Sequence, residues 1–216
     1  KLVCPTFHIE GKGDTLEGIN LTIEVTVPYP EMFRIEVYHH KGTAAGTPCF
    51  PLQMHNDIPM DYSETSDSVC IYSGSMTLEI CKKPFSMIFR RGKDVISRSG
   101  LRDLCYVKDG WNGYAYDHPG NAYMSQRLSL SVDELIYGMG ERFGAFVKNG
   151  QTVVIENKDG GTSSNQSYKN VPFYLSNKGY GIFVNHPETV EFEVGTDQVS
   201  KCGFSVKGER LDYFFI

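Results

Sequence analysis

A polar segment, residues 157–170, holds the densest group of side chains that could bind a ligand. It contains Asp159, which is followed by Gly160, Gly161 and Thr162, and it continues with amides and hydroxyls. Sugar hydroxyls both donate and accept hydrogen bonds, and sugar rings stack on aromatic faces. A carboxylate with amides and hydroxyls beside aromatic residues is therefore typical of a site for hydroxyl-rich ligands. The same composition also fits an ordinary solvated hairpin loop.

Other catalytic patterns are absent or incomplete. The glycines of Gly138–Gly144 lack the spacing of a dinucleotide-binding loop, and no helix is predicted after them, so we interpret them as a tight crossing between strands. No serine lies in a G-x-S-x-G motif. His39 and His40 would point to opposite faces of a strand over Phe33–His40 and could not share a metal ion. The sequence thus predicts no metal and no cofactor.

The six cysteines are scattered and none forms a C-x-x-C pair, which argues against structural zinc. An even number permits three disulfides, but a chain of this length has enough core to fold without them. We interpret the cysteines as buried, reduced thiols and expect a cytoplasmic protein.

Charge and composition exclude several classes of partner. The 216 residues carry a net charge of −5, so there is no basic surface for nucleic acid or for an anionic membrane. No apolar run approaches the roughly 20 residues of a membrane span. Hydrophobic residues make up 40% and charged residues 22%, which is typical of a globular protein.

The elements that must position the polar segment are predicted to be β-strands. Apolar residues alternate with period two in several runs, among them Leu21–Val27, Phe33–Val37 and Met76–Ile80. Short turn sequences such as Asn149-Gly150 separate the runs. The pattern predicts an all-β, antiparallel β-sandwich or barrel. Two long stretches, Thr43–Ser68 and Leu101–Asn121, are predicted to be connections with little regular structure.

Several motifs in a fixed order resemble one family. Tyr137–Phe143 resembles the Y-G-x-G-E-R-F signature in the N-terminal β-sandwich of glycoside hydrolase family 31. The segments that follow match in order, and two weaker landmarks precede them: Asn157–Asp159, Tyr168–Tyr174, Gly179–Pro187, Glu191–Gly195 and Leu211–Phe214, with Arg34–Gly42 and Lys83–Ser86 upstream. Phe146–Thr152 and Asp159–Ser163 look most like the α-xylosidase branch of this family.

The resemblance implies a fold and a role. Family members are retaining α-glycosidases that need no metal, and their catalytic Asp residues belong to a (β/α)₈ barrel that follows the sandwich. Nothing in residues 1–216 resembles the nucleophile motif. The resemblance implies a single galactose-mutarotase-like supersandwich domain over 1–216, without catalytic residues. The start at Lys1 and the apolar end at Tyr213–Ile216 lead us to expect a piece of a longer protein.

The same resemblance implies the partners. They are the parent's own C-terminal barrel and an α-linked xyloside or glucoside, and the parent could form a homo-oligomer. In the family a loop of the sandwich reaches over the barrel mouth and helps to form the substrate pocket. The matching residues are Asp159, Gly160, Gly161 and Thr162, and we expect Asp159 to accept hydrogen bonds from sugar hydroxyls.

Three alternatives stay open. A separate carbohydrate-binding module would use Trp111, Tyr114 and Tyr116 as an aromatic platform. An aldose epimerase would need a His and a Glu as acid and base, but His118 and His186 suggest no such pair. A structural interface domain would use part of the Tyr and Phe excess, and without its barrel it would expose a large apolar patch and self-associate.

Overall fold

The chain folds almost entirely into antiparallel strands. The structure is a computed structural model that describes residues 1–16, 18–42, 49–55, 58–109, 121–158 and 164–216. Its described helical content is one 3-10 turn, η1 (Lys12–Thr15). Within these ranges, no helix has the length and hydropathy of a membrane span. The prediction of an all-β, antiparallel fold is confirmed.

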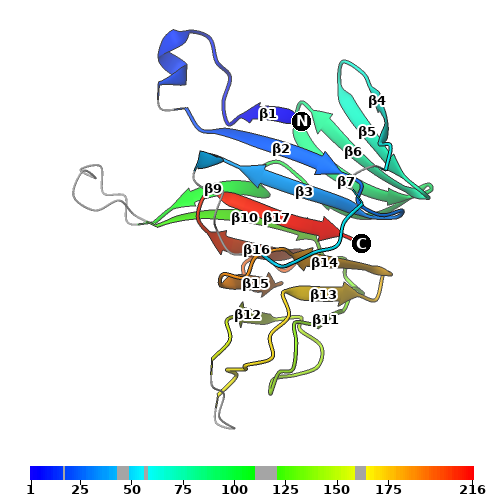
Figure 1. The fold of residues 1–216 in the computed structure, drawn as a ribbon, viewed down its shortest axis with the longest axis vertical. Helices are drawn as coiled ribbons and strands as arrows, with labels where there is room; N and C mark the ends of the chain where they lie inside the picture. Colours follow the sequence, from blue (N-terminus) through cyan, green and yellow to red (C-terminus); the bar gives the residue numbers. More distant parts are fainter. Residues whose placement is uncertain (17, 43–48, 56–57, 110–120, 159–163) are drawn as a thin grey trace.

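One layer of the molecule is a seven-stranded sheet, which crosses the middle of Figure 1. Its strands come from distant parts of the sequence, so the first and last strands of the chain lie in one sheet. In spatial order they are β1 (Leu2–Pro5), β2 (Asn20–Thr26), β3 (Phe33–Tyr38), β17 (Arg210–Phe215), β14 (Tyr180–Val184), β13 (Phe173–Ser176) and β11 (Ile136–Gly138).

Two five-stranded sheets form the other layer. One has the order β12 (Gln151–Ile155), β15 (Val190–Val194), β16 (Lys201–Lys207), β10 (Ala122–Ser129) and β9 (Leu104–Lys108). The other has the order β4 (Asp61–Glu64), β5 (Ser68–Ser73), β6 (Met76–Lys82), β7 (Phe85–Arg91) and β8 (Asp94–Ser99). The two meet at β8 and β10, where the amide of Arg98 donates to Ser129 Oγ at 3.0 Å.

The alternating residues predicted to share one face do lie inside. Ile23, Ile35 and Val37 are completely buried on the inner face of the seven-stranded sheet. The Tyr213 ring of β17 meets the Phe204 ring of β16, in the five-stranded sheet that starts with β12, edge to face. The ring centroids are 5.0 Å apart. Period-two alternation over a half-buried strand thus predicted the core correctly.

The inner face also packs on the second five-stranded sheet, through a stack of three rings. Phe215 of β17 is stacked on Phe89 of β7 with centroids 4.0 Å apart, and on Tyr180 of β14 with centroids 4.9 Å apart. Phe89 and Phe215 are fully buried. The side chain of Phe215 therefore links the two layers.

Three expectations need correction. The stretch Thr43–Ser68 contains β4, and the stretch Leu101–Asn121 contains β9, which pairs with β10. Strand β4 is exposed throughout and has no apolar alternation, and β9 is a short strand whose last two residues are exposed. Strand β3 ends at Tyr38, so His39 lies beyond it. All six cysteines are free as predicted, but only Cys202 is buried and Cys49 is exposed.

Replacing Phe215 tests the link between the layers. Phe215→Ala should lower the free energy of unfolding by about 3–5 kcal/mol, because it leaves a cavity between Phe89 and Tyr180. Urea unfolding of the 216-residue chain measures the change. Phe143→Ala, at a ring that is 63% exposed, is the control and should stay within about 0.5 kcal/mol. Equal losses in the two variants would contradict the packing described.

Candidate functional site

The polar segment lies at the end of the molecule formed by β11 and β12. Its two arms are joined by an isolated parallel bridge between Asn157 and Ser167, where the Lys158 amide donates to the Ser167 carbonyl at 3.1 Å. Asp159, Gly160, Gly161 and Thr162, the predicted binding residues, lie outside the described residues. The structure therefore describes the base of this loop, residues 156–158 and 164–170.

The side chain of Asn170 closes the base. Its amide nitrogen lies 2.9 Å from the Glu156 carbonyl, 2.9 Å from Asn157 Oδ1 and 2.6 Å from the Ser167 carbonyl. These acceptors belong to both arms of the loop. Asn170 thus fixes the distance between the arms with a single side chain.

The glycine motif packs directly against the second arm. Gly138, Met139 and Gly140 all have positive φ values, of 105°, 69° and 86°. A Cβ on Gly140 would lie 2.1 Å from the Lys169 carbonyl oxygen, so only glycine allows this approach. The Glu141 amide then donates to that same carbonyl at 3.0 Å. The predicted tight crossing is confirmed, and it forms part of the loop base.

Arg142 of the same motif ties three segments together. Its guanidinium donates to the Met139 carbonyl (3.3 Å), to the Asn165 carbonyl (3.2 Å) and to the Val154 carbonyl of β12. Burial lowers the pKa of Arg142, yet a guanidinium stays charged in proteins. A planar group with five N–H donors suits this task, because one side chain can reach carbonyls in several directions.

Ser167 completes the base from the loop side. Its hydroxyl donates to the Glu141 carbonyl at 2.6 Å and accepts from the Lys169 amide at 3.1 Å. The ion pair between Lys169 and Glu141 has an N–O distance of 3.1 Å, but both side chains are exposed. Exposed pairs of this kind add little stability. The hydrogen bonds to the backbone therefore hold the loop.

The described part of this site is built to position a segment of chain. No group of three or more His, Cys, Asp or Glu residues that could hold a metal ion occurs among the described residues. The carboxylates at the loop base, Glu141 and Glu156, are exposed. No carboxylate of the described loop base has the buried setting that tunes a general acid or base.

Sequence reasoning did not assign to Arg142, Ser167 and Asn170 their role in shaping the base. Arg142 and Asn170 lie within the quoted family motifs, but no local pattern showed which carbonyls they reach. The platform proposed for a carbohydrate-binding module, Trp111, Tyr114 and Tyr116, lies outside the described residues, as does His118.

His186 has a structural role in the described part of the chain. Its Nε2 accepts a hydrogen bond from the Asp212 amide at 3.0 Å, so the proton of the neutral ring is on Nδ1, 3.2 Å from Glu188. Burial lowers the pKa of His186 and favours this neutral form. Both ring nitrogens are engaged, which does not suit an epimerase acid.

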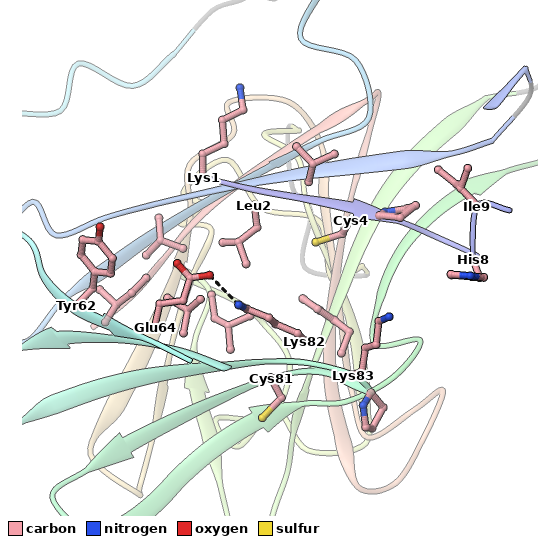
Figure 2. Close-up of a pocket in the computed structure, with 18 of the residues that line it drawn as sticks. Lys1, Leu2, Cys4, His8, Ile9, Tyr62, Glu64, Cys81, Lys82 and Lys83 are labelled. Carbon is pink, nitrogen blue, oxygen red and sulfur yellow. Dashed lines mark hydrogen bonds and ion pairs between the residues drawn. The ribbon is translucent and has the colours of Figure 1, made fainter. Parts of the chain in front are cut away.

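A groove in the described part lies at the opposite end of the molecule. This groove of about 860 Å³ runs between β1 and the sheet that starts with β4 (Figure 2). Figure 2 shows Lys82 pointing to Glu64, with a 2.7 Å ion pair, and Leu2 and Cys4 pointing inward from β1. Its floor is formed by core residues such as Ile71 and Ile80. The groove is separate from the loop base.

A comparison with protein families decides the assignment. The model of the glycosyl hydrolase 31 N-terminal galactose mutarotase-like domain matches residues 22–193. The chain belongs to this family. The match includes the crossing, Arg142 and the whole loop.

Two curated relatives that match nearly the whole chain are named α-xylosidases. The family 31 domain is 37% identical to an α-xylosidase of Emericella nidulans, over 95% of the chain and 28% of the relative. It is 36% identical to the α-xylosidase XylQ of Lactiplantibacillus pentosus, over 99% of the chain and 27% of the relative. The chain thus spans little more than a quarter of these longer enzymes.

Solved structures share the fold. A family 31 dextranase of Flavobacterium johnsoniae, complexed with isomaltotriose, superposes with a TM-score of 0.75 at 17% identity, over 93% of this chain and 24% of that one. A family 31 α-xylosidase from a soil metagenome, complexed with xylose, gives 0.67 at 18% identity, over 93% and 30%. At these identities the comparison supports the sandwich fold alone.

Removing the Arg142 guanidinium should loosen the loop base. Arg142→Ala should lower the free energy of unfolding by about 2 kcal/mol, because three carbonyls lose a charged donor. Hydrogen exchange at the Lys158 and Glu141 amides should become faster. Urea unfolding and exchange mass spectrometry measure both effects. Arg98→Ala, at an exposed residue of β8, is the control, and a loss no larger than this control's would remove Arg142 from its assigned role.

Proposed function

We propose that this chain is the non-catalytic N-terminal domain of a retaining α-glycosidase, an α-xylosidase, and that its loop completes the substrate pocket of the following barrel. The observation that carries the proposal is the loop base. Gly140 and Arg142 of the family motif hold the arms of one polar loop. Such a scaffold is expected where the tip of a loop must be placed accurately.

The geometry of the base supports a positioned role for Asp159, the residue that follows it in the chain. The preceding residue, Lys158, donates its amide to Ser167, and Asn157 is held by the Asn170 side chain. Asp159 therefore follows directly after an anchored residue, Lys158. Preorganisation of this kind reduces the entropy lost when a ligand binds.

The proposed chemistry is recognition. Asp159 accepts hydrogen bonds from the hydroxyls of the sugar at or next to the cleaved bond, each worth about 1.5–3 kcal/mol where water is excluded. Gly160 and Gly161 let the backbone approach the sugar, and Thr162 adds a hydroxyl. The barrel supplies the nucleophile and the acid/base, so no residue of this chain transfers a proton or attacks the sugar.

The names of the relatives support the substrate class. Two proteins at 36–37% identity over nearly the whole chain are named α-xylosidases. An α-linked xyloside is thus the substrate to test first, with an α-glucoside as the alternative. We further propose a cytoplasmic location, which rests on the six free cysteines.

The role of the loop tip is tested in the longer enzyme that contains this chain. Asp159→Ala should lower kcat/KM for an α-xyloside at least about tenfold, which corresponds to about 1.4 kcal/mol of lost binding in the transition state. The matched control is Asp94→Ala at the exposed start of β8, which should leave kcat/KM unchanged. An unchanged kcat/KM in Asp159→Ala would remove the loop from the substrate pocket.

The 216-residue chain by itself should not hydrolyse glycosides. It should show no turnover of aryl α-xylosides or α-glucosides above the rate without protein, because both catalytic groups belong to the barrel. A discontinuous assay at high protein concentration measures this. Turnover that survives further purification would overturn the domain assignment, and tight binding of oligosaccharides would favour a separate carbohydrate-binding module.

A further inference from the structure

The outer face of the seven-stranded sheet is polar on one side and apolar on the other. On β2 and β3 the outward residues are polar, as is usual for an antiparallel sheet with one solvated face. They are Thr22, Glu24 and Thr26 on β2, and Arg34 and Glu36 on β3. This half of the sheet has the composition of a surface exposed to water.

The other half of the same face is apolar. The residues directly opposite one another in the ladder are Phe173 and Phe183, Phe183 and Phe214, and Tyr137 and Leu175. We call these five residues, with Phe146, the outer apolar face. They come from β11, β13, β14 and β17, and from the segment after β11.

The outer apolar face is continuous. The rings of Phe183 and Phe214 have centroids 5.8 Å apart. The Phe173 ring lies over Gly181, where a Cβ would come within 2.8 Å of it. At the edge of the sheet, Phe146 packs on Tyr137 with centroids 5.3 Å apart. A surface of this kind contains few groups that could hydrogen-bond to a sugar.

Among the residues that the structure describes, the cover over this face lies at one end. Segment 49–55 crosses the sheet near β14 (Figure 1), where the Phe50 and Phe183 rings have centroids 5.8 Å apart. Phe214, whose ring lies 5.7 Å from the Arg34 guanidinium, is only 3% exposed. Toward the other end, Leu175 is 50% exposed and Phe146 is 78% exposed. Large exposed apolar residues gathered in one place mark an interaction surface.

The uncovered end adjoins the loop base. Tyr137 immediately precedes the crossing at Gly138, and the Phe173 carbonyl accepts the Met139 amide at 2.8 Å. A protein domain that covers Leu175 and Phe146 would therefore also contact the loop base. At the covered end the face is bordered by charge, since Arg34 is 2.7 Å from the fully buried Asp212. An apolar centre with a polar border is typical of protein interfaces.

We infer that the outer apolar face is the docking surface for the catalytic domain of the same polypeptide. This inference rests on the proposed function. The relatives are more than three times as long as the region that matches this chain, so they contain a body large enough to cover the face. Docking there would bring the loop base to the edge of the contact, next to any pocket that the two domains share.

Radical footprinting compares the face in two forms of the protein. The side chains of Phe146 and Leu175 should be oxidised readily in the 216-residue chain and at least about fivefold more slowly in the longer enzyme, because interface cores exclude water. Tyr72 and Leu101, exposed residues of the other layer, are internal controls and should react equally in both forms. Equal oxidation of Phe146 and Leu175 in both forms overturns the inference.

A charge placed on the face gives an independent test. Leu175→Asp should change the melting temperature of the 216-residue chain no more than Leu101→Asp does, because both leucines are exposed there. In the longer enzyme only Leu175→Asp should lower the melting temperature or separate the unfolding of the two domains. Matching effects of the two variants in the longer enzyme overturn the inference.

The remaining outcomes identify other occupants and also overturn the inference. Protection that needs added xyloside would make the face a saccharide platform. Protection that depends on the concentration of the longer enzyme, with a dimer in sedimentation, would assign the face to a second copy. The test is separate from that of the loop, because protection at Leu175 does not require Asp159 to contact substrate.

Discussion

The fold depends on the inner face of the seven-stranded sheet, which is shared by the two sheets of the other layer. The seven-stranded sheet packs on two five-stranded sheets at once, and the ring stack of Phe89, Phe215 and Tyr180 is where one of these contacts is closest. Phe215 belongs to the last strand, which pairs with β3 near the start of the chain and with β14. The core is therefore complete only when both ends of the chain are in place, which makes the whole sandwich one cooperative unit.

The loop base shows how a rigid sandwich can present a polar segment. A solvated loop of this composition would ordinarily sample many conformations. Here the positive-φ crossing brings the backbone of Gly140 against Lys169, and Arg142 connects that crossing to β12 and to Asn165. The signature residues of the family thus act on the arms of the loop, and in our proposal the residues at its tip recognise the sugar.

The outer face relates the fold to a larger assembly. Alternation along β13 places Tyr174 in the core and leaves Leu175 half exposed, although both are apolar. An antiparallel strand with apolar residues on both faces is unusual at a surface and common between two packed bodies. Segment 49–55 already covers Phe183 at one end of this face, through the Phe50 ring. We propose that the catalytic domain continues that cover toward the loop.

The sequence by itself determined the class of fold, the inner residues of most strands and the tight crossing. These features follow from local rules: the strand period of two separates Ile35 from Arg34, and the glycines of 138–140 allow positive φ. The short strands β4 and β9 were not predicted, because β4 has no buried residue and β9 has only Leu104 and Tyr106 packed against the core. Only the tertiary structure decided which carbonyls Arg142 reaches and that Phe173, Phe183 and Phe214 form one row. These contacts join residues far apart in the chain, and they depend on strand register, which no local pattern encodes.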